Sequence, residues 1–405
     1  MSVTYAEAGR RGKDVRSDLF ISIEPTNAGG IELNLSSKVD TLYGDSIRNL
    51  VAQGMEHFAI PNAKVTIEDQ GALPFVLMAR LEATVRRLYP DKPVTPWLPE
   101  AIEAVGESAK KRPRRSRLYL PGNEPKFMIN AALHQPDGLI LDLEDSVAPS
   151  EKDAARVLVR NALLSLPFGE CERMVRINQG ERGLSDLEEI VPHGVQLVLI
   201  PKVESAEELQ QIDNHLQKLR EQHNISYPIW IMPIIESARG AWFAFDIASA
   251  CESVSSLAIG LEDYTADIGA QRTNEGRESF WARSQVLNGA KAAGVQAIDT
   301  VFSDVGDMDG LMASVQEAKS LGFEGKGCIH PRQIAVVHEG FAPSETEIDR
   351  AKKIVMAFEK AEKMGLGVVS LGSKMIDPPV VKRALRVVEQ AERDRLLPAD
   401  WRDEV

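Results

Sequence analysis

The chain has 405 residues, more than one hydrophobic core usually serves, so we expect two or three folding units. Its hydrophobic content of 43%, aromatic content of 6% and charged content of 26% are typical of a soluble globular protein and exclude collagen-like, low-complexity and largely disordered chains. Sixty acidic residues against 47 basic ones leave a net charge of -13. Such a surface repels phosphate backbones and anionic lipids, so we expect neither nucleic acid nor a membrane as a partner.

The cysteines and the N-terminus give no sign of an exported protein. Cys171, Cys251 and Cys328 lie far apart and form no CxxC pair, so neither a disulfide framework nor a thiolate metal site is indicated. No apolar stretch follows the basic residues near the N-terminus, as a secretory signal would require. The longest apolar run, around Ile229 to Ile235, is too short to span a bilayer. We therefore expect a cytoplasmic protein.

Residues 1–90 predict a small α+β domain. Leu19–Ile23 and Ile31–Leu35 alternate apolar and polar residues, which is typical of half-buried antiparallel strands. Further along, the pattern predicts a helix over Asp45–Glu56, a strand over Val65–Ile67 and an amphipathic helix over Gly71–Leu88.

Residues 91–114 predict a linker, because they are rich in proline, which fixes φ and removes a backbone donor. The basic run Lys110–Arg117 at its end is interpreted as a solvated connector.

Residues 115–335 predict a (β/α)8 TIM barrel. Eight short runs that are apolar on both faces alternate with helical stretches, as in parallel sheets covered on both faces. An open, doubly wound sheet is the alternative. The runs are Leu118–Leu120, Leu139–Leu141, Met174–Ile177, Leu197–Ile200, Ile229–Ile235, Leu257–Ile259, Ala297–Phe302 and Gly327–Ile329. Residues 336–405 predict a C-terminal helical extension or lid, with helices over Glu345–Met364 and from Pro379.

Polar residues follow most of the predicted barrel strands, and the carboxyl ends of such strands carry the active sites of TIM barrels. Several carboxylates on one rim would repel one another unless a cation lies between them, and Mg²⁺ suits oxygen ligands of which the protein supplies only one or two. The alternative is that these carboxylates cap helices or pair with nearby basic side chains. The strand-end residues are Asp142, Glu144, Asp145, Arg176, Asn178, Lys202, Glu204, Glu236, Arg239, Glu262, Asp263, Asp299 and His330.

The same stretches carry a family resemblance. The chain contains RSRLYLPGNEPKFMINAAL, DGLILDLEDSVAPSEKDAAR, VRIN, LIPKVES, PIIESARG, AIGLEDYTADIG and GCIHPRQI, in that order. Over about residues 115–381 it resembles the citrate lyase beta subunit and the malyl-CoA and citramalyl-CoA lyases. The segments IELNLSSKVDTLYGDSIRNLV and IEDQGALPFVLMARLEATVRR resemble the citrate lyase gamma subunit, an acyl carrier protein.

The resemblance implies a role for particular residues. Glu236 and Asp263 match the family's Mg²⁺ ligands, and Arg176 matches its arginine for the substrate carboxylate. Glu144 and Asp145 match carboxylates that hold metal-bound waters. The resemblance implies two further residues: Arg115 would bind the substrate at the thioester phosphates or the reacting end, and the catalytic Asp377 would reach into a neighbouring subunit of a trimer.

One departure from the carrier family concerns its prosthetic group. The family attaches a phosphoribosyl-dephospho-CoA arm to a serine in a Glu-Ser-x-Asp stretch, but here the stretch reads Val15-Arg16-Ser17-Asp18. Arg16 takes the place of the serine, so we expect the covalent arm to be absent. If an arm is present, Ser17 carries it.

The resemblance implies an Mg²⁺-dependent lyase that cleaves a 3-hydroxyacyl-CoA thioester to acetyl-CoA and a 2-oxo acid. The carbinol carbon of the substrate bears hydrogen, methyl or carboxymethyl, and the sequence leaves that choice open. The first alternative is a citrate lyase component that acts on a carrier-bound citryl thioester with a CoA-transferase partner. The second is a thioesterase that hydrolyses malyl-CoA-like thioesters, and a non-catalytic interaction protein is the third.

Overall fold

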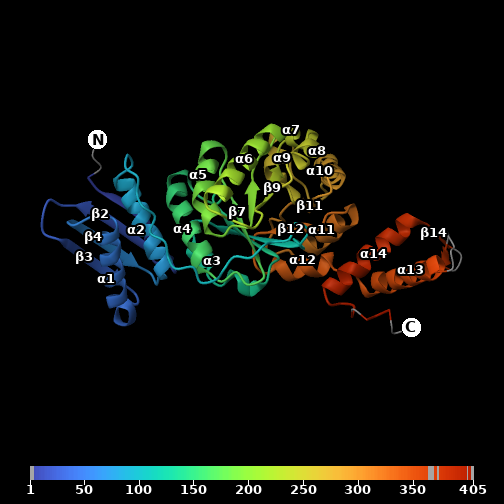
Figure 1. Cartoon of the computed structure of the whole chain (residues 1–405), viewed down its shortest axis with the longest axis horizontal. Coiled ribbons are helices and arrows are strands. Elements are labelled where there is room, and N and C mark those ends of the chain that lie inside the picture. Colours follow the sequence, from blue (N-terminus) through green and yellow to red (C-terminus); the bar gives the residue numbers. More distant parts are fainter. Residues whose placement is uncertain (1–3, 364–368, 372–373, 399, 403–405) are drawn as a thin grey trace. The chain divides into compact units, whose positions relative to one another are not determined.

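The computed structural model describes residues 4–363, 369–371, 374–398 and 400–402. The chain forms two compact units, Met1–Val337 and His338–Val405. The first unit contains a small sheet domain followed by a closed barrel, and the second is mainly helical (Figure 1). No helix of the described residues is long and apolar enough to cross a membrane.

The small domain at the N-terminus is a four-stranded sheet with the order β1-β2-β4-β3 and two helices. β2 pairs antiparallel with β1 and β4, as the alternating pattern predicts. β3 instead runs parallel to β4, because helix α1 connects these two strands and returns the chain to the same end of the sheet. The elements are β1 (Ala6–Gly9), β2 (Leu19–Pro25), β3 (Ile31–Ser37), α1 (Asp40–His57), β4 (Ala63–Asp69) and α2 (Pro74–Leu88).

Helix α2 joins this domain to the barrel. It packs on β1 and β2 on one side and on the barrel helix α4 (Lys152–Ser165) on the other. Two buried ion pairs lie in this contact. Glu82 binds Arg160 at 2.7 Å, and both side chains are fully buried. Arg80 binds Asp18 at 2.8 Å and also donates to the carbonyl oxygen of Asn123 in a barrel loop. The small domain is therefore fixed to the barrel by charges that have no access to water.

The predicted linker is an ordered strap without regular secondary structure. The backbone N–H of Trp97 donates to Glu82, and Trp97 packs against the core of the small domain. At the end of the strap Arg114 is fully buried and binds Glu172 at 2.7 Å. The interpretation of Lys110–Arg117 as a solvated connector is therefore wrong for Arg114 and Arg117, which are 0% and 1% exposed. Arg114 tolerates burial because Glu172 neutralises it.

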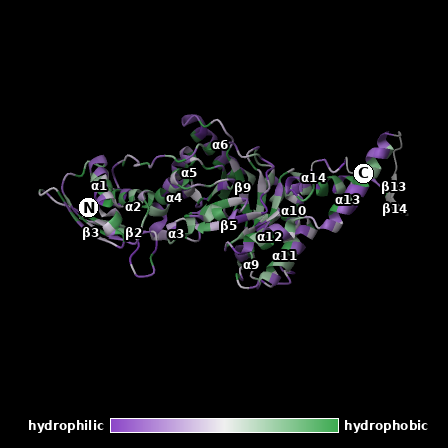
Figure 2. Ribbon diagram, turned by 90° about the horizontal axis from the view of Figure 1, so that it is seen from below, coloured by the Kyte–Doolittle hydropathy of each residue, from purple (hydrophilic) through white to green (hydrophobic). Residues whose placement is uncertain are grey.

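The barrel is closed and consists of eight parallel strands, as predicted. Each strand pairs in register with its neighbours, and β12 pairs with β5 to complete the ring. The strands are apolar and form the green interior in Figure 2, whereas the outer helix α6 (Ala206–Gln222) is largely hydrophilic. The strands are β5 (Ser116–Pro121), β6 (Gly138–Asp142), β7 (Glu172–Arg176), β8 (Leu197–Ile200), β9 (Trp230–Ile235), β10 (Ser256–Ile259), β11 (Gln296–Asp299) and β12 (Gly325–Cys328).

Helices follow most of these strands and cover the barrel. The longer ones agree with the helical periods of the sequence, although β11 ends before the predicted Phe302. The remaining helices of the first unit and its boundary are α3 (Pro125–Met128), α5 (Gly180–Ile190), α7 (Ala238–Trp242), α8 (Ala244–Ala248), α9 (Leu261–Asp267), α10 (Phe280–Ala292), α11 (Met308–Leu321) and α12 (Gln333–Phe341), with 3₁₀ turns at Ala131–His134, Pro149–Glu151 and Val191–His193.

The second unit has a core of its own between two helices, α13 (Glu345–Lys363) and α14 (Pro378–Arg393). Val355, Val388 and Trp401 are almost completely buried in this core. The helices agree with the predicted ones to within one residue at each predicted boundary. The short antiparallel strands β13 (Val369–Leu371) and β14 (Lys374–Ile376) were not predicted from the sequence.

The Glu82–Arg160 pair generates a prediction for the contact between α2 and α4. Glu82→Ala leaves the buried guanidinium of Arg160 with Glu189 as its remaining carboxylate partner and removes the acceptor of the Trp97 N–H, so we expect the free energy of unfolding to fall by about 3 kcal/mol. Urea unfolding followed by tryptophan fluorescence measures this loss. Asp45→Ala is the control, because Asp45 is fully exposed on α1 and lies 3.8 Å from Arg48. Equal free energies of unfolding for the two variants would contradict a stabilising role of the buried Glu82–Arg160 pair.

Candidate active site

A cavity of about 430 Å³ opens at the carboxyl ends of the barrel strands. Its volume lies within the usual range for small-molecule sites. The cavity is lined by side chains from separate strands and the loops that follow them, among them Tyr119, Asp142, Arg176, Glu236 and Asp263. Parallel strands end at the same rim, so residues distant in sequence meet there.

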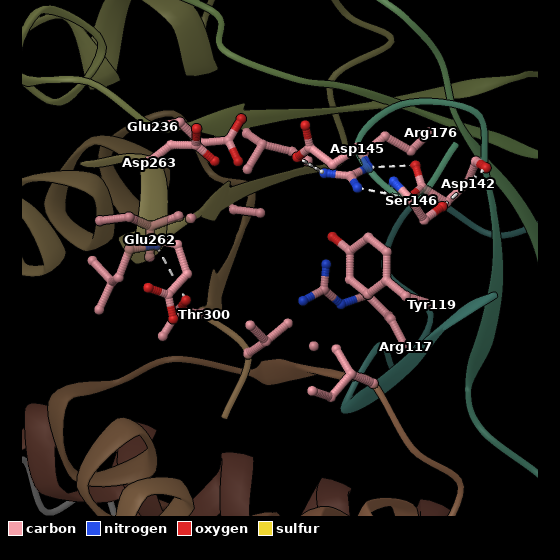
Figure 3. A pocket seen from close by; sticks show the side chains of 18 of the residues that line it. Arg117, Tyr119, Asp142, Asp145, Ser146, Arg176, Glu236, Glu262, Asp263 and Thr300 are labelled. Atoms are coloured by element: carbon pink, nitrogen blue, oxygen red, sulfur yellow. Dashed lines mark hydrogen bonds and ion pairs between the residues drawn. The ribbon is translucent and has the colours of Figure 1, made fainter. Parts of the chain in front are cut away.

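Arg176, the last residue of β7, organises one side of the cavity (Figure 3). Its Nε and Nη2 atoms bind the two carboxylate oxygens of Asp142 at 2.6 and 2.7 Å. Its Nη1 atom lies 3.1 Å from Glu144 and 3.2 Å from Asp145. Burial by itself raises the pKa of Asp142, but the hydrogen bonds and charge of Arg176 outweigh burial and hold that pKa below its usual value. The guanidinium therefore gathers three carboxylates into a fixed cluster.

Glu236 and Asp263 form the opposite side of the cavity, where their carboxylates lie close together in Figure 3. Glu236 follows β9 and is only 7% exposed. Burial raises its pKa, the nearby charge of Arg176 lowers it and the charge of Asp263 raises it, and the net result is a pKa of about 8. Glu236 accepts a hydrogen bond from the backbone N–H of Lys202 at 2.9 Å. A side chain at Gly260 would approach Glu236 to 2.5 Å, so this close packing requires glycine there.

Lys202 lies between the two groups of carboxylates. Its Nζ atom is 3.4 Å from Asp263 and 3.4 Å from Glu144. These contacts share one positive charge among several carboxylates, and nearby carboxylates raise the pKa of Lys202 despite its partial burial. The buried Glu236 has no side-chain cation of its own among the described residues. The charge balance of the cavity therefore favours binding of an additional cation.

The donor set fits Mg²⁺ with few protein ligands. Among the residues that the structure describes, no three or more His, Cys, Asp or Glu side chains are grouped to hold a metal ion. Glu236 and Asp263 would supply two carboxylate ligands. Mg²⁺ commonly takes one or two protein carboxylates and completes its octahedron with water and substrate oxygens. The two-carboxylate arrangement thus suits this ion better than a closed structural site.

The structure brings most of the sequence-predicted site residues together, but not all of them. Glu144, Asp145, Arg176, Glu236 and Asp263 surround one cavity or its immediate contacts.

Arg115 lies instead before the start of β5, at the opposite end of the barrel, where it binds Asp137 at 3.0 Å. The structure therefore does not place Arg115 at the substrate, because the strand β5 separates it from the rim.

Two other predicted residues lie outside the cavity lining. Asp377 is the N-cap of α14 in the second unit, where it accepts a hydrogen bond from the N–H of Val380. That Asp377 contributes to the active site of a neighbouring subunit stays a prediction. Ser17 lies in the loop between β1 and β2 with a left-handed φ of 54°, and its N–H donates to Gln70 at 3.1 Å. That the covalent arm is absent from Ser17 also stays a prediction.

Sequence reasoning missed two side chains of the cavity, Arg117 and Tyr119. Both lie on β5 and line the cavity. Residues 117, 119 and 121 alternate with outward-facing neighbours, so they share the inner face of the strand. The alternation of inward-facing and outward-facing residues could have predicted Tyr119 in the cavity. Arg117 was missed because it was counted with the basic residues of the connector.

Comparison with known proteins gives family matches for both parts of the first unit. The family model described as HpcH/HpaI aldolase/citrate lyase matches residues 115–331. A model described as malonate decarboxylase delta subunit (MdcD), an acyl carrier model, matches residues 9–88. A third, described as a C-C bond lyase of the TIM-barrel fold, matches residues 277–393. The acyl-carrier resemblance of the small domain is thereby confirmed.

Individual relatives match about 70% of the chain. Citrate lyase subunit beta of Haemophilus influenzae is 40% identical over 286 residues, covering 69% of this chain and 97% of the relative. Mitochondrial citramalyl-CoA lyase of Rattus norvegicus is 34% identical over 294 residues, covering 69% and 86%. The crystal structure of CitE from Mycobacterium tuberculosis with magnesium, acetoacetate and coenzyme A has a TM-score of 0.58 and 30% identity, covering 70% and 99%.

The raised pKa of Glu236 predicts that the metal-free protein, kept in the presence of a chelator, becomes less stable as the pH rises. The carboxyl has an ordinary pKa of 4.5 when unfolded and about 8 when folded. Between these values the folded protein binds more protons than the unfolded one, so stability falls as pH rises and this loss is complete above about 8. Glu236→Gln removes this loss. We expect the variant to melt at a higher temperature than the wild type at pH 8 and at a similar temperature at pH 5.

Differential scanning fluorimetry at both pH values measures this difference. Glu262→Gln is the matched control, because Glu262 is a rim carboxylate that is 60% exposed and already paired with Arg272. Added Mg²⁺ should raise the melting temperature of the wild type and of the control, but not that of Glu236→Gln. If Glu236→Gln does not raise the melting temperature at pH 8, burial does not raise the pKa of Glu236 in the folded protein.

Proposed function

The chain belongs to the HpcH/HpaI aldolase/citrate lyase family, and from this premise we propose that it is an Mg²⁺-dependent lyase for a 3-hydroxyacyl-CoA thioester. The products would be acetyl-CoA and a 2-oxo acid. One observation carries the proposal: Glu236 and Asp263 face each other in one cavity beside the cluster organised by Arg176. The named citramalyl-CoA lyase relative and the magnesium and coenzyme A in the CitE crystal structure support the same chemistry.

The proposed cleavage is a retro-Claisen step. The substrate hydroxyl loses its proton, the bond between the carbinol carbon and the α-carbon breaks, and its electron pair passes into the thioester enolate. Protonation of that enolate at carbon gives the acetyl thioester. When bound, Mg²⁺ would act as a Lewis acid and template for the hydroxyl and the adjacent carboxylate.

The protein groups then have distinct tasks. Glu236 and Asp263 would hold the ion, and Glu144 and Asp145 would orient water beside it. Arg176 keeps both of these carboxylates in place through its Nη1 atom, and its permanent charge favours the negative charge that develops nearby. Asp377 from a neighbouring copy would supply the proton for the acetyl carbon. A shared site of this kind requires an oligomer, for which we propose a trimer.

The substrate is proposed to be a free CoA thioester rather than a carrier-bound one. Ser17 adjoins Asp18, which is buried and bound to Arg80, and Arg80 is bound to the barrel through Asn123. These contacts fix the loop that a carrier must move when it delivers its arm. The alternative, a citrate lyase component with an arm on Ser17 and a CoA-transferase partner, requires this loop to detach.

Product analysis tests the proposal. We expect protein from a host that attaches no arm to release a 2-oxo acid from malyl-, citramalyl- or citryl-CoA when Mg²⁺ is present. Glu236→Ala and Asp263→Ala should each lower kcat at least about a hundredfold, because the ion loses a ligand. Lactate dehydrogenase and malate dehydrogenase assays, with chromatography for glyoxylate, identify the oxo acid.

Ser17→Ala is the matched control for this experiment, and it is compared with wild-type protein when both are prepared from the native host, where an arm could be attached. It should keep wild-type activity if the free thioester is the substrate, and complete loss of activity would favour the carrier alternative. Release of CoA and an intact hydroxy acid, with no oxo acid, would replace the lyase by a thioesterase. Full activity in Glu236→Ala would reject the metal assignment.

A further inference from the structure

Arg117 is a buried guanidinium that faces the cavity without a carboxylate partner. It lies on β5, is 1% exposed and lines the cavity. Its Nη1 atom contacts the Met232 sulfur at 3.1 Å, and its Nε atom has no hydrogen-bond partner in the part of the chain that the structure describes. Figure 3 shows the guanidinium beside the Tyr119 ring, directed into the cavity.

The other arginines with less than 2% exposure among the described residues are all paired. Arg80 binds Asp18, Arg114 binds Glu172 and Arg160 binds Glu82, each at 2.7 to 2.8 Å. Burial of an unpaired charge is strongly unfavourable, so buried charges are normally neutralised. Arg117 departs from the rule that this chain otherwise follows.

The carboxylates of the cavity do not serve as partners of Arg117, because each has other contacts. Asp142 is bound on both oxygens by Arg176. Asp299 is bound by Arg283 at 3.0 Å and by Lys326 at 2.9 Å. Desolvation lowers the pKa of Arg117, which agrees with a cation that the protein itself leaves uncompensated. The missing negative charge must therefore come from a ligand.

The position of Arg117 along β5 indicates which part of a bound ligand it would contact. Arg117 precedes Tyr119 on the inner face of β5, so it lies deeper in the barrel than the rim that carries Glu236 and Asp263. In the proposed reaction Glu236 and Asp263 would hold the ion at that rim, and the ion would bind the carboxylate and hydroxyl on the carbinol carbon. The third substituent of that carbon is then the group able to extend toward Arg117.

We propose that Arg117 binds a carboxylate on this third substituent, so that the preferred substrate is of the citryl type and the 2-oxo acid released is a dicarboxylate. A planar guanidinium in a dry cavity is well suited to a carboxylate. A methyl group or hydrogen, as in citramalyl- or malyl-CoA, leaves the charge of Arg117 unpaired. This inference rests on the proposed lyase function for the identity of the ligand.

Binding of the oxo acids tests the inference without turnover. Isothermal titration calorimetry with freshly dissolved oxaloacetate and pyruvate, each with Mg²⁺, compares a dicarboxylate with a monocarboxylate. The wild type should bind oxaloacetate at least about tenfold more tightly than pyruvate. Arg117→Met should weaken oxaloacetate binding about 30-fold or more, because it removes a desolvated charge pair. Pyruvate binding should change by less than about threefold, and Arg117→Lys should retain part of the oxaloacetate preference.

Arg283→Met is the matched control, because Arg283 is also buried but is fully paired with Asp299 and Glu317. It should lower the melting temperature and keep the preference for oxaloacetate, whereas Arg117→Met should leave the ligand-free melting temperature unchanged or higher. Equal loss of oxaloacetate and pyruvate binding in Arg117→Met, or unchanged oxaloacetate binding, would overturn the inference.

The two proposals fail in different ways. If the wild type prefers oxaloacetate and Arg117→Met does not, the role of Arg117 stands even when no thioester is cleaved, and the lyase proposal alone fails. If citramalyl-CoA is cleaved faster than citryl-CoA and the wild type binds pyruvate as tightly as oxaloacetate, the lyase proposal stands and the inference on Arg117 fails.

Discussion

The cavity of this protein depends on the burial of one carboxyl group, that of Glu236, beside the carboxylate of Asp263. Glu236 is almost buried, its pKa is raised to about 8, and Asp263 adds to the shift. The strand ends and Gly260 fix Glu236 in this position, although burial there disfavours its charged form. Such stored unfavourable energy is characteristic of sites completed by a ligand. A dication held by these two side chains would offset this cost and supply the Lewis-acid chemistry of the proposed lyase.

Elsewhere in the first unit, the chain neutralises its buried charges internally. Arg80, Arg114 and Arg160 each have a buried carboxylate partner. The pairs of Arg114 and Arg160 join the strap and the small domain to the barrel, and Arg80 reaches the barrel through the carbonyl oxygen of Asn123. The small domain is therefore bound to the barrel within the first unit. The cavity differs from the rest of the unit in this respect, because Glu236 and Arg117 both line it and neither has an oppositely charged side chain bound to it.

The sequence was sufficient for the barrel and for most of its rim. Apolar runs on both faces predict parallel strands, and the residues just after them, such as Asp142 and Glu236, must lie at one end of the barrel. The same apolar runs do not show where a strand begins, so Arg117 was grouped with the basic connector although it is the second residue of β5 and lines the cavity. β3 was placed antiparallel because an alternating pattern is the same for both directions of pairing. The pair Glu82–Arg160 is 78 residues apart and has no local signature.

The most direct test of the central claim is a crystal structure with Mn²⁺ in place of Mg²⁺, solved with anomalous scattering at the manganese edge. The account predicts one strong anomalous peak in the barrel, bonded to one oxygen each of Glu236 and Asp263 and otherwise to water. No peak in the cavity, or a peak bound by other side chains while these two carboxylates point apart, would contradict it.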